Sequence, residues 1–198
     1  MLNTLITELL AIAAIAAIAS FASHYYGLIQ SKADVEKAWA KLAVALTRRR
    51  AALDELLDAA KGDERFRPGV LTDARRLLSS TGTPESGAQR FAAEVKLSSA
   101  IGKVLASSQN YPNLAHDLHY RKLEETLLDL EEEIARRRDI YNAQVAANNA
   151  HFNNIFERSI AQFADAFPWD PFPESPGEAT SGATISAKTR TVPIALAG

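Results

Sequence analysis

The chain has 198 residues, a formal net charge of −2 and no cysteine. The near-neutral charge excludes a global electrostatic attraction to nucleic acid or anionic lipid, and the lack of cysteine excludes disulfides, thiolate catalysis and Cys-ligated zinc. Alanine, leucine, glutamate and arginine are abundant and only nine residues are glycine, a composition that favours helices over strands. The length accommodates one membrane anchor and one domain of about 130 to 150 residues.

Residues 1–8 form a short N-terminal segment, and an apolar helix is predicted over residues 9–26. Residues 9–22 carry no charged side chain, and the predicted helix rises about 27 Å, close to the roughly 30 Å hydrocarbon core of a bilayer. Tyr25 and Tyr26 stand at its end, where aromatic side chains commonly meet the membrane surface. We therefore predict a transmembrane helix over residues 9–26 that contacts the lipid bilayer.

Two other interpretations compete with an anchor. A cleaved signal peptide ordinarily has Lys or Arg before its apolar run, and residues 1–8 contain neither. A buried helix of a soluble protein is the other alternative, because alanine contributes little to membrane insertion. Lys32, Lys37 and Lys41 follow the span, whereas no basic residue precedes it. A single-pass topology in the cell (inner) membrane is therefore expected, with the N-terminus outside and the bundle in the cytoplasm.

Residues 27–167 are predicted to form a helical bundle. Its first helix, over residues 28–61, continues the anchor, because neither proline nor glycine interrupts this stretch. Apolar side chains recur in it at spacings of four and three, and Arg49 occupies the one missing position. These seam positions are Val35, Trp39, Leu42, Leu46, Leu53, Leu56 and Ala60.

Three further helices are expected. A short one covers residues 68–79, and the next follows Thr83, a predicted N-cap, and Pro84 in its first turn. This third helix has Phe91, Val95, Ser98, Gly102 and Leu105 at heptad spacing. The fourth is predicted from about Asn113 or Asp117 to Phe167. Its seam consists of Leu123, Leu127, Leu130, Ile134, Arg137 and Tyr141, then Val145, Asn148, Phe152 and Phe156.

The predicted fold is all-α: an N-terminal transmembrane helix that continues into an antiparallel, coiled-coil-like bundle of three to four helices. The two long helices form a pair, and the two shorter ones fill the gap on one side. Residues 168–198 are expected to be disordered, because a Gly-, Ser-, Thr- and Ala-rich tail buries little apolar surface. Trp169 and Phe172 are candidate partner-docking residues, although we favour a segment that folds back over the end of the bundle.

Several short motifs occur in a fixed order along the chain. They are Ala38-Trp39, Leu46-Thr47-Arg48-Arg49-Arg50, Ala74-Arg75, Tyr111-Pro112-Asn113-Leu114, Ile134-Ala135-Arg136-Arg137, Tyr141-Asn142, Val145 and Asn148. From the anchor to about residue 172 the chain thereby resembles LemA family proteins. It departs from their pattern at Tyr26-Gly27-Leu28, at Phe156-Glu157 and over residues 50–56.

The resemblance implies a membrane-anchored antiparallel helical bundle and implies no catalytic residues. It makes a set of motif positions candidate structural residues. These are Trp39, Arg49, Tyr111, Pro112, Arg137, Tyr141, Asn142 and Asn148.

Arg49 and Arg137 occupy seam positions of the two long helices. One hypothesis joins them to acids such as Glu55, Glu124 or Glu131 in an internal polar layer that sets the register of the helices. The alternative is that their stems line the edge of the seam while the guanidinium groups reach water. We favour this alternative for Arg49 and weigh the two interpretations evenly for Arg137.

Two other polar patterns are expected to lie on the surface. His116 and His119 have the i, i+3 spacing of helical metal ligands, but no matching set of histidines and acids accompanies them, so an exposed helix start is favoured. Glu132 with Arg136, and Glu133 with Arg137, have the i, i+4 spacing of weak ion pairs on a solvated helix face.

The sequence contains no nucleophile elbow, phosphate-binding glycine loop, HExxH or paired-carboxylate signature. We therefore expect no catalytic activity, cofactor, metal, nucleic acid or small-molecule substrate. The leading hypothesis is a membrane-anchored helical scaffold or adaptor whose partners are other membrane proteins or further copies of itself. The alternative is a self-assembling protein that shapes or organises membranes.

Overall fold

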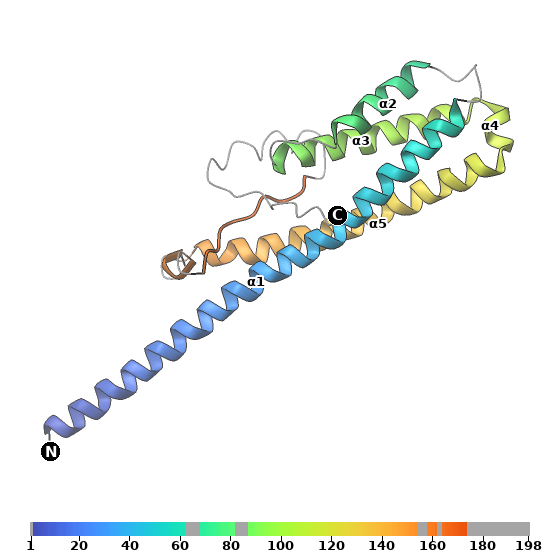
Figure 1. Ribbon diagram of the computed structural model, residues 1–198. Helices are drawn as coiled ribbons and strands as arrows, with labels where there is room; N and C mark the ends of the chain where they lie inside the picture. The colour runs from blue at the N-terminus through green and yellow to red at the C-terminus, as the bar shows by residue number, and fades with distance from the viewer. Residues whose placement is uncertain (1, 62–67, 82–86, 154–157, 162–163, 174–198) are drawn as a thin grey trace.

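The computed structural model describes residues 2–61, 68–81, 87–153, 158–161 and 164–173, and all regular structure in these ranges is helical. Figure 1 shows two long helices, α1 and α5, with α2 and α3 lying on one side of them. The helices are α1 (Leu2–Ala60), α2 (Pro68–Ser80), α3 (Gly87–Ser108), α4 (Pro112–His116) and α5 (Leu118–Ala150), followed by a 3-10 turn, η1 (His151–Asn153).

The predicted anchor and the first helix of the predicted bundle are one unbroken helix, α1. Its N-terminal part projects away from the rest of the molecule (Figure 1), and the side chains of residues 3–21 are exposed. Leu28 is the first buried residue of α1, and it packs against Ile160 and Ala161. The helix therefore has two parts. We call the apolar part before Leu28 the free part and the part from Leu28 onward the packed part.

α1 and α5 run in opposite directions along each other. Near one end of the pair, the rings of Trp39 and Tyr141 lie 5.7 Å apart. Near the other end, His119 Nε2 lies 3.6 Å from Glu55 Oε1. The predicted seam residues of α1 are buried, and so are those of α5 from Leu123 to Asn148 except Arg137, which is partly exposed. Burying each leucine contributes about 1.5 to 3 kcal/mol.

The buried apolar residues form two main clusters along the helix pair. The distal core comprises Ala52, Leu53, Leu56, Leu57, Ala60, Ala74, Leu97, Ala100, Ile101, Val104, Leu105, Leu114, Tyr120, Leu123, Leu127 and Leu130. The proximal core, on the side of the free part of α1, comprises Val35, Ala38, Trp39, Leu42, Ala45, Leu46, Phe91, Ile134, Tyr141, Val145, Trp169 and Phe172. α3 contributes several residues to the distal core but only Phe91 to the buried part of the proximal one.

The predicted inner face of the third helix is partly wrong. Gly102 is exposed, whereas Leu97, Ile101 and Val104 are buried in the distal core. Because α3 contacts α2 as well as the long helices, it buries a wider stripe than a heptad seam covers. The predicted cap at Thr83 and Pro84 lies outside the described residues.

The later of the two predicted starts of the fourth helix, Asp117, is confirmed, but the helix is shorter than predicted and a separate short helix, α4, precedes it. Asp117 separates α4 from α5 with an extended backbone (ψ 115°), and its carboxylate accepts hydrogen bonds from the N–H groups of His119 (2.8 Å) and Tyr120 (3.1 Å). This is an N-cap, which begins α5 anew. α5 ends at Ala150 rather than at Phe167, and the predicted seam residue Phe156 lies outside the described residues.

The segment that follows Phe167 is not wholly a disordered tail. Residues 168–173 are described, and within them Trp169 and Phe172 are 3% and 4% exposed. These two side chains therefore belong to the core and are not presented to a partner. The favoured alternative, a segment that folds back, is confirmed for these residues, although they cover the helix pair rather than the end of the bundle. Residues 174–198 lie outside the described part of the chain.

The adjacent residues Leu127 and Leu128 provide a matched test of the packing. Leu127 is completely buried in the distal core, whereas Leu128 is 56% exposed. Leu127→Ala is expected to lower the free energy of unfolding by about 2 to 5 kcal/mol, because it leaves a cavity. Leu128→Ala should change it by no more than about 0.5 kcal/mol. Denaturant unfolding of the full chain in mild detergent, followed by circular dichroism, measures both; equal losses would contradict this packing.

Candidate functional site

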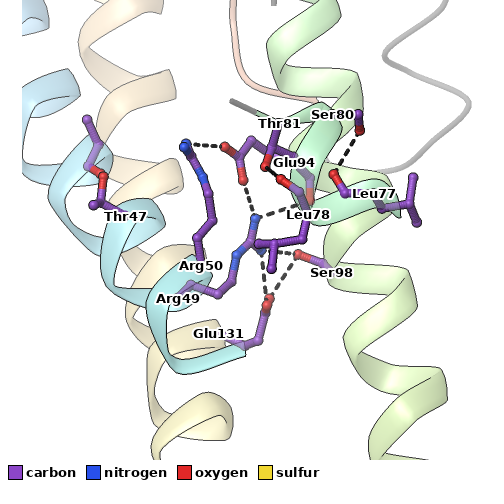
Figure 2. A network of polar contacts seen from close by, with 11 residues as sticks. Thr47, Arg49, Arg50, Leu77, Leu78, Ser80, Thr81, Glu94, Ser98 and Glu131 are labelled. Carbon is purple, nitrogen blue, oxygen red and sulfur yellow. Dashed lines mark hydrogen bonds and ion pairs between the residues drawn. The ribbon is translucent and has the colours of Figure 1, made fainter. Parts of the chain in front are cut away.

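The side chain of Arg49 lies where α1, α3 and α5 meet (Figure 2). It is only 1% exposed. Its Nη1 donates to Ser98 Oγ on α3 and, over 3.0 Å, to Glu131 Oε1 on α5. Its Nη2 donates to the carboxylate of Glu94 and, over 3.2 Å, to the main-chain oxygen of the same residue. We call Arg49, Glu94, Ser98 and Glu131 the polar layer; it ties three helices together and separates the distal core from the proximal core.

The favoured interpretation of Arg49 as an edge residue is therefore wrong, and the internal polar layer is correct for this position. Of the three acids predicted for it, only Glu131 takes part; Glu55 instead lies near His119. The buried acid, Glu94, was missed, because it is on α3 and not on the helix pair. Arg50 Nη2 also donates to Glu94, over 2.7 Å, so two cations compensate one buried carboxylate.

For Arg137 the edge interpretation is correct, in which the stem lines the seam and the guanidinium group reaches water. Its Nε donates to Glu133 on the same helix over 2.7 Å, and about a third of its side chain is exposed. The predicted pair of Glu132 and Arg136 is also present, at 3.9 Å. Arg137 therefore lies at the edge of the seam and takes no part in the polar layer.

The two histidines do not share one helix face. His116 is the last residue of α4 and His119 lies in the first turn of α5, with the non-helical Asp117 between them. Among the described residues, no group of three or more His, Asp or Glu side chains is arranged to hold a metal ion.

A second polar arrangement holds the chain after Phe167 against α5. Asn142 Nδ2 donates to the main-chain oxygen of Phe172 (2.8 Å), and the N–H of Phe172 donates to Asn142 Oδ1 (2.7 Å). Asn149 makes the same two hydrogen bonds with Trp169, each 2.8 Å long. Each asparagine thus binds both main-chain polar groups of one residue. We call this pair the asparagine clamp.

The spacing of the clamp matches an extended chain. Asn142 and Asn149 are seven residues apart, which is about 10.5 Å along a helix and nearly two full turns. Trp169 and Phe172 are three residues apart, which is about 9 to 10 Å in an extended or polyproline II conformation. Prolines at 168, 171 and 173 favour such a conformation and have no N–H to leave unpaired. The clamp therefore recognises an extended main chain in one register.

The side chains of this segment complete the proximal core. The ring of Phe172 lies 4.8 Å from that of Phe91, whose ring is 5.6 Å from Trp39. Tyr141 donates its hydroxyl to the main-chain oxygen of Asp170 over 2.9 Å, and burial raises the pKa of this tyrosine well above its usual range. Tyr141 thus stays neutral and acts as a hydrogen-bond donor. Residues 167–173 thus pack against α1, α3 and α5, and we call the surface of these helices that the segment covers the groove.

The structure brings several of the predicted motif residues together in this groove. Trp39, Tyr141 and Asn142 line it, and Asn148 Nδ2 donates to the main-chain oxygen of Phe167 over 3.2 Å. Asn149 was missed, because its heptad spacing from Asn142 indicates a binding site only when an extended segment is known to lie beside it. Other predicted residues lie elsewhere. Tyr111 packs against the distal core, Pro112 is the first residue of α4, and Tyr25 and Tyr26 lie on α1 near its first buried residue.

Comparison with known proteins adds a family. A model described as the LemA family matches residues 38–183. The matched range contains the polar layer, the asparagine clamp and the segment that fills the groove. No match was found among the curated proteins.

Removal of Arg49 tests the polar layer. Arg49→Met leaves the buried Glu94 with only one partner cation, so the free energy of unfolding should fall by about 3 to 5 kcal/mol. The exposed neighbour gives the matched control: Arg48→Met should change it by no more than about 0.5 kcal/mol. Adding Glu94→Leu to Arg49→Met should recover most of the loss, because no uncompensated carboxylate is then buried. If the double variant loses as much free energy of unfolding as Arg49→Met and Glu94→Leu lose together when measured singly, the coupling of the two residues is refuted.

Hydrogen exchange of the amides of Trp169 and Phe172 tests the asparagine clamp. Asn142→Ala removes two hydrogen bonds and should speed the exchange of the Phe172 amide about 5- to 150-fold, as a loss of about 1 to 3 kcal/mol implies. Asn149→Ala should do the same at Trp169. Gln144→Ala, on the same helix, is the control and should leave both amides protected. Unchanged exchange in both asparagine variants would show that the clamp does not hold the segment.

Proposed function

Because the chain belongs to the LemA family and combines an exposed apolar helix with a peptide-filled groove, we propose that it is a membrane-anchored helical scaffold or adaptor without catalytic activity. The free part of α1 is the observation that carries this proposal. Among the described residues, α1 is the helix long and apolar enough to cross a membrane. Ile12, Ile15 and Ile18 are 64%, 67% and 70% exposed in the isolated chain. In water so much apolar surface is unfavourable, and a bilayer would cover it.

The length of the free part supports a single span. From Asn3 to the first buried residue, Leu28, the helix rises about 37 Å, enough to cross a hydrocarbon core of roughly 30 Å. Tyr25 stacks on Phe21 with their centroids 6.3 Å apart, and Tyr26 is exposed. Aromatic side chains in this place suit the interface between lipid and water.

The packed part of α1 begins directly after this interface. Lys32 Nζ donates to the main-chain oxygen of Asp165 over 3.1 Å, and Lys37 and Lys41 are exposed. The excess of lysine on this side supports a cytoplasmic bundle and an outer N-terminus. In this proposal α1 and α5 form an antiparallel, coiled-coil-like rod, and α1 sets both its height above the membrane and its direction.

A scaffold of this kind acts by binding and positioning. Its attachment restricts it to a thin layer at the membrane and raises its effective concentration toward other membrane proteins. Self-assembly that organises the membrane is the second candidate function. It is supported by apolar side chains on the outside of the bundle, since Val44, Leu128 and Ile140 are more than half exposed. Chemical crosslinking in native membranes separates the two functions: defined heteromers support the adaptor and large homo-oligomers support self-assembly.

Charges placed in the free part of α1 test the anchor. Ile12→Arg with Ile15→Arg should release the chain from membranes, because each arginine at the centre of a span costs about 2.5 to 3.5 kcal/mol. The matched control is Ile12→Leu with Ile15→Leu, which preserves the apolar surface. Extraction of membranes at alkaline pH, followed by sedimentation, measures retention. Retention of the double arginine variant equal to that of the control would contradict a membrane span.

A further inference from the structure

We propose that the groove between α1, α3 and α5 is a binding site for an extended juxtamembrane peptide of a partner membrane protein. The peptide would carry two aromatic side chains three residues apart, next to prolines. The chain's own residues 167–173 occupy the site until such a peptide displaces them. This inference rests on the proposed adaptor function and names the partner's chemistry.

The asparagine clamp supplies affinity for a main chain rather than for particular side chains. Toward the described part of the segment, the hydrogen bonds of Asn142 and Asn149 reach main-chain N–H and C=O groups, those of Phe172 and Trp169. Any extended peptide presents these groups at the same spacing, as in strand addition to a sheet edge. Specificity then comes from the proximal core, where Trp39, Phe91 and Tyr141 surround the aromatic positions.

Prolines suit a peptide for this site. A polyproline II chain has three residues per turn, so side chains at positions i and i+3 lie on one side of it. In the resident segment Trp169 and Phe172 hold these two positions, and Pro171 is exposed between them. Because proline already restricts the chain to an extended shape, a peptide of this composition loses little conformational entropy on binding.

The resident segment fits the groove imperfectly. The indole N–H of Trp169 is buried, and within the described part of the chain it has no hydrogen-bond partner; the same holds for Oδ1 of Asn148, whose side chain is completely buried. Burial also raises the pKa of the Asp170 carboxyl, so its ionised form is disfavoured there. A peptide with Phe in place of Trp169 and Asn in place of Asp170 avoids two of these penalties. Such a partner can compete with the resident segment.

The position of the groove points to a juxtamembrane peptide. Lys32 Nζ lies 5.5 Å from the centre of the Phe167 ring, and Trp39 lies in the core beside Phe172. Lys32 and Trp39 are about 6 and 17 Å along α1 from Leu28, the first buried residue. About five extended residues span the 17 Å from the level of Leu28 to that of Trp39. A peptide bound in the same direction as the resident segment therefore runs away from the membrane. The transmembrane span of the partner would end a few residues before this peptide begins.

The test uses the full chain in mild detergent and two fluorescent peptides. One has the sequence of residues 166–173, and the other has the same sequence with Phe for Trp169 and Asn for Asp170. Trp169→Ala with Phe172→Ala opens the groove of the chain. By fluorescence polarisation the opened chain should bind both peptides, the second about tenfold more tightly because it buries no unpaired indole N–H. The wild-type chain should bind the second peptide about 100-fold more weakly than the opened chain, since its own segment competes at millimolar effective concentration.

Controls separate groove binding from other causes. Adding Asn142→Ala and Asn149→Ala to the opened chain should weaken binding more than tenfold, whereas adding Gln144→Ala should not change it. Peptides with N-methyl groups on the amides of the two aromatic residues should not bind. If circular dichroism shows that the opened chain is unfolded, Phe172→Ala alone replaces it.

Three outcomes would overturn the proposal. One is the absence of saturable binding to a folded, opened chain. Another is binding to the opened chain without any displacement in the wild-type chain, which would make the segment a permanent part of the fold. The third is an exchange of residues 167–173 between two copies, seen as a wild-type dimer by native mass measurement. Membrane retention is measured separately for every variant, so that a failed anchor and a failed groove give different results.

Discussion

The buried charge of Arg49 is the constraint on which the arrangement of the helices depends. A guanidinium group that is only 1% exposed must be compensated where it lies, and its donors reach α3 and α5 at once. The positions of the three helices along their axes are thereby fixed relative to one another, because Glu94, Ser98 and Glu131 must all contact the same guanidinium group. Replacement of such a layer by apolar residues often preserves stability, so its contribution lies in the register of the helices more than in the free energy of unfolding.

The polar layer also divides the molecule into parts with different composition. On its distal side, α2 and α3 cover the helix pair, and the core consists almost entirely of aliphatic side chains. On its proximal side, Phe91 is the apolar side chain of α3 that is buried against the pair, the guanidinium group of Arg90 lies over the ring of Trp39, and residues 167–173 take the place of a helix. An extended segment has unpaired main-chain groups that a helix satisfies internally, and the asparagine clamp satisfies them here. The asparagine clamp is thus needed locally because α3 does not cover the helix pair beyond Phe91 on the proximal side.

The sequence predicted the helices that depend on local periodicity and missed the contacts that depend on distant segments. The four-three spacing from Val35 to Ala60 and from Leu123 to Tyr141 identified both long helices and their buried faces. Glu131 was among the predicted partners of Arg49, but Glu94 could not be inferred, because it lies on a helix whose orientation follows from the tertiary fold. Likewise, the heptad spacing of Asn142 and Asn149 acquires a meaning only beside an extended segment with a three-residue spacing. Composition suggested disorder after Phe167, but two aromatic side chains and three prolines were sufficient to order residues 168–173.

Because the bundle has two separate cores, a peptide could replace residues 167–173 in the groove while the rest of the bundle stays folded. Residues 167–173 contribute to the proximal core only, and the distal core together with the polar layer contains none of them. Release of the segment would therefore expose Trp39, Phe91 and Tyr141 while the contacts of Arg49 with Glu94 and Glu131 persist. Exposure of three aromatic rings is unfavourable in water, so an empty groove would be short-lived, and exchange requires an incoming peptide that covers the same rings. Attachment of α1 to a membrane would hold the groove within reach of peptides that emerge from the same surface, and this proximity is what would make such an exchange competitive with the chain's own segment.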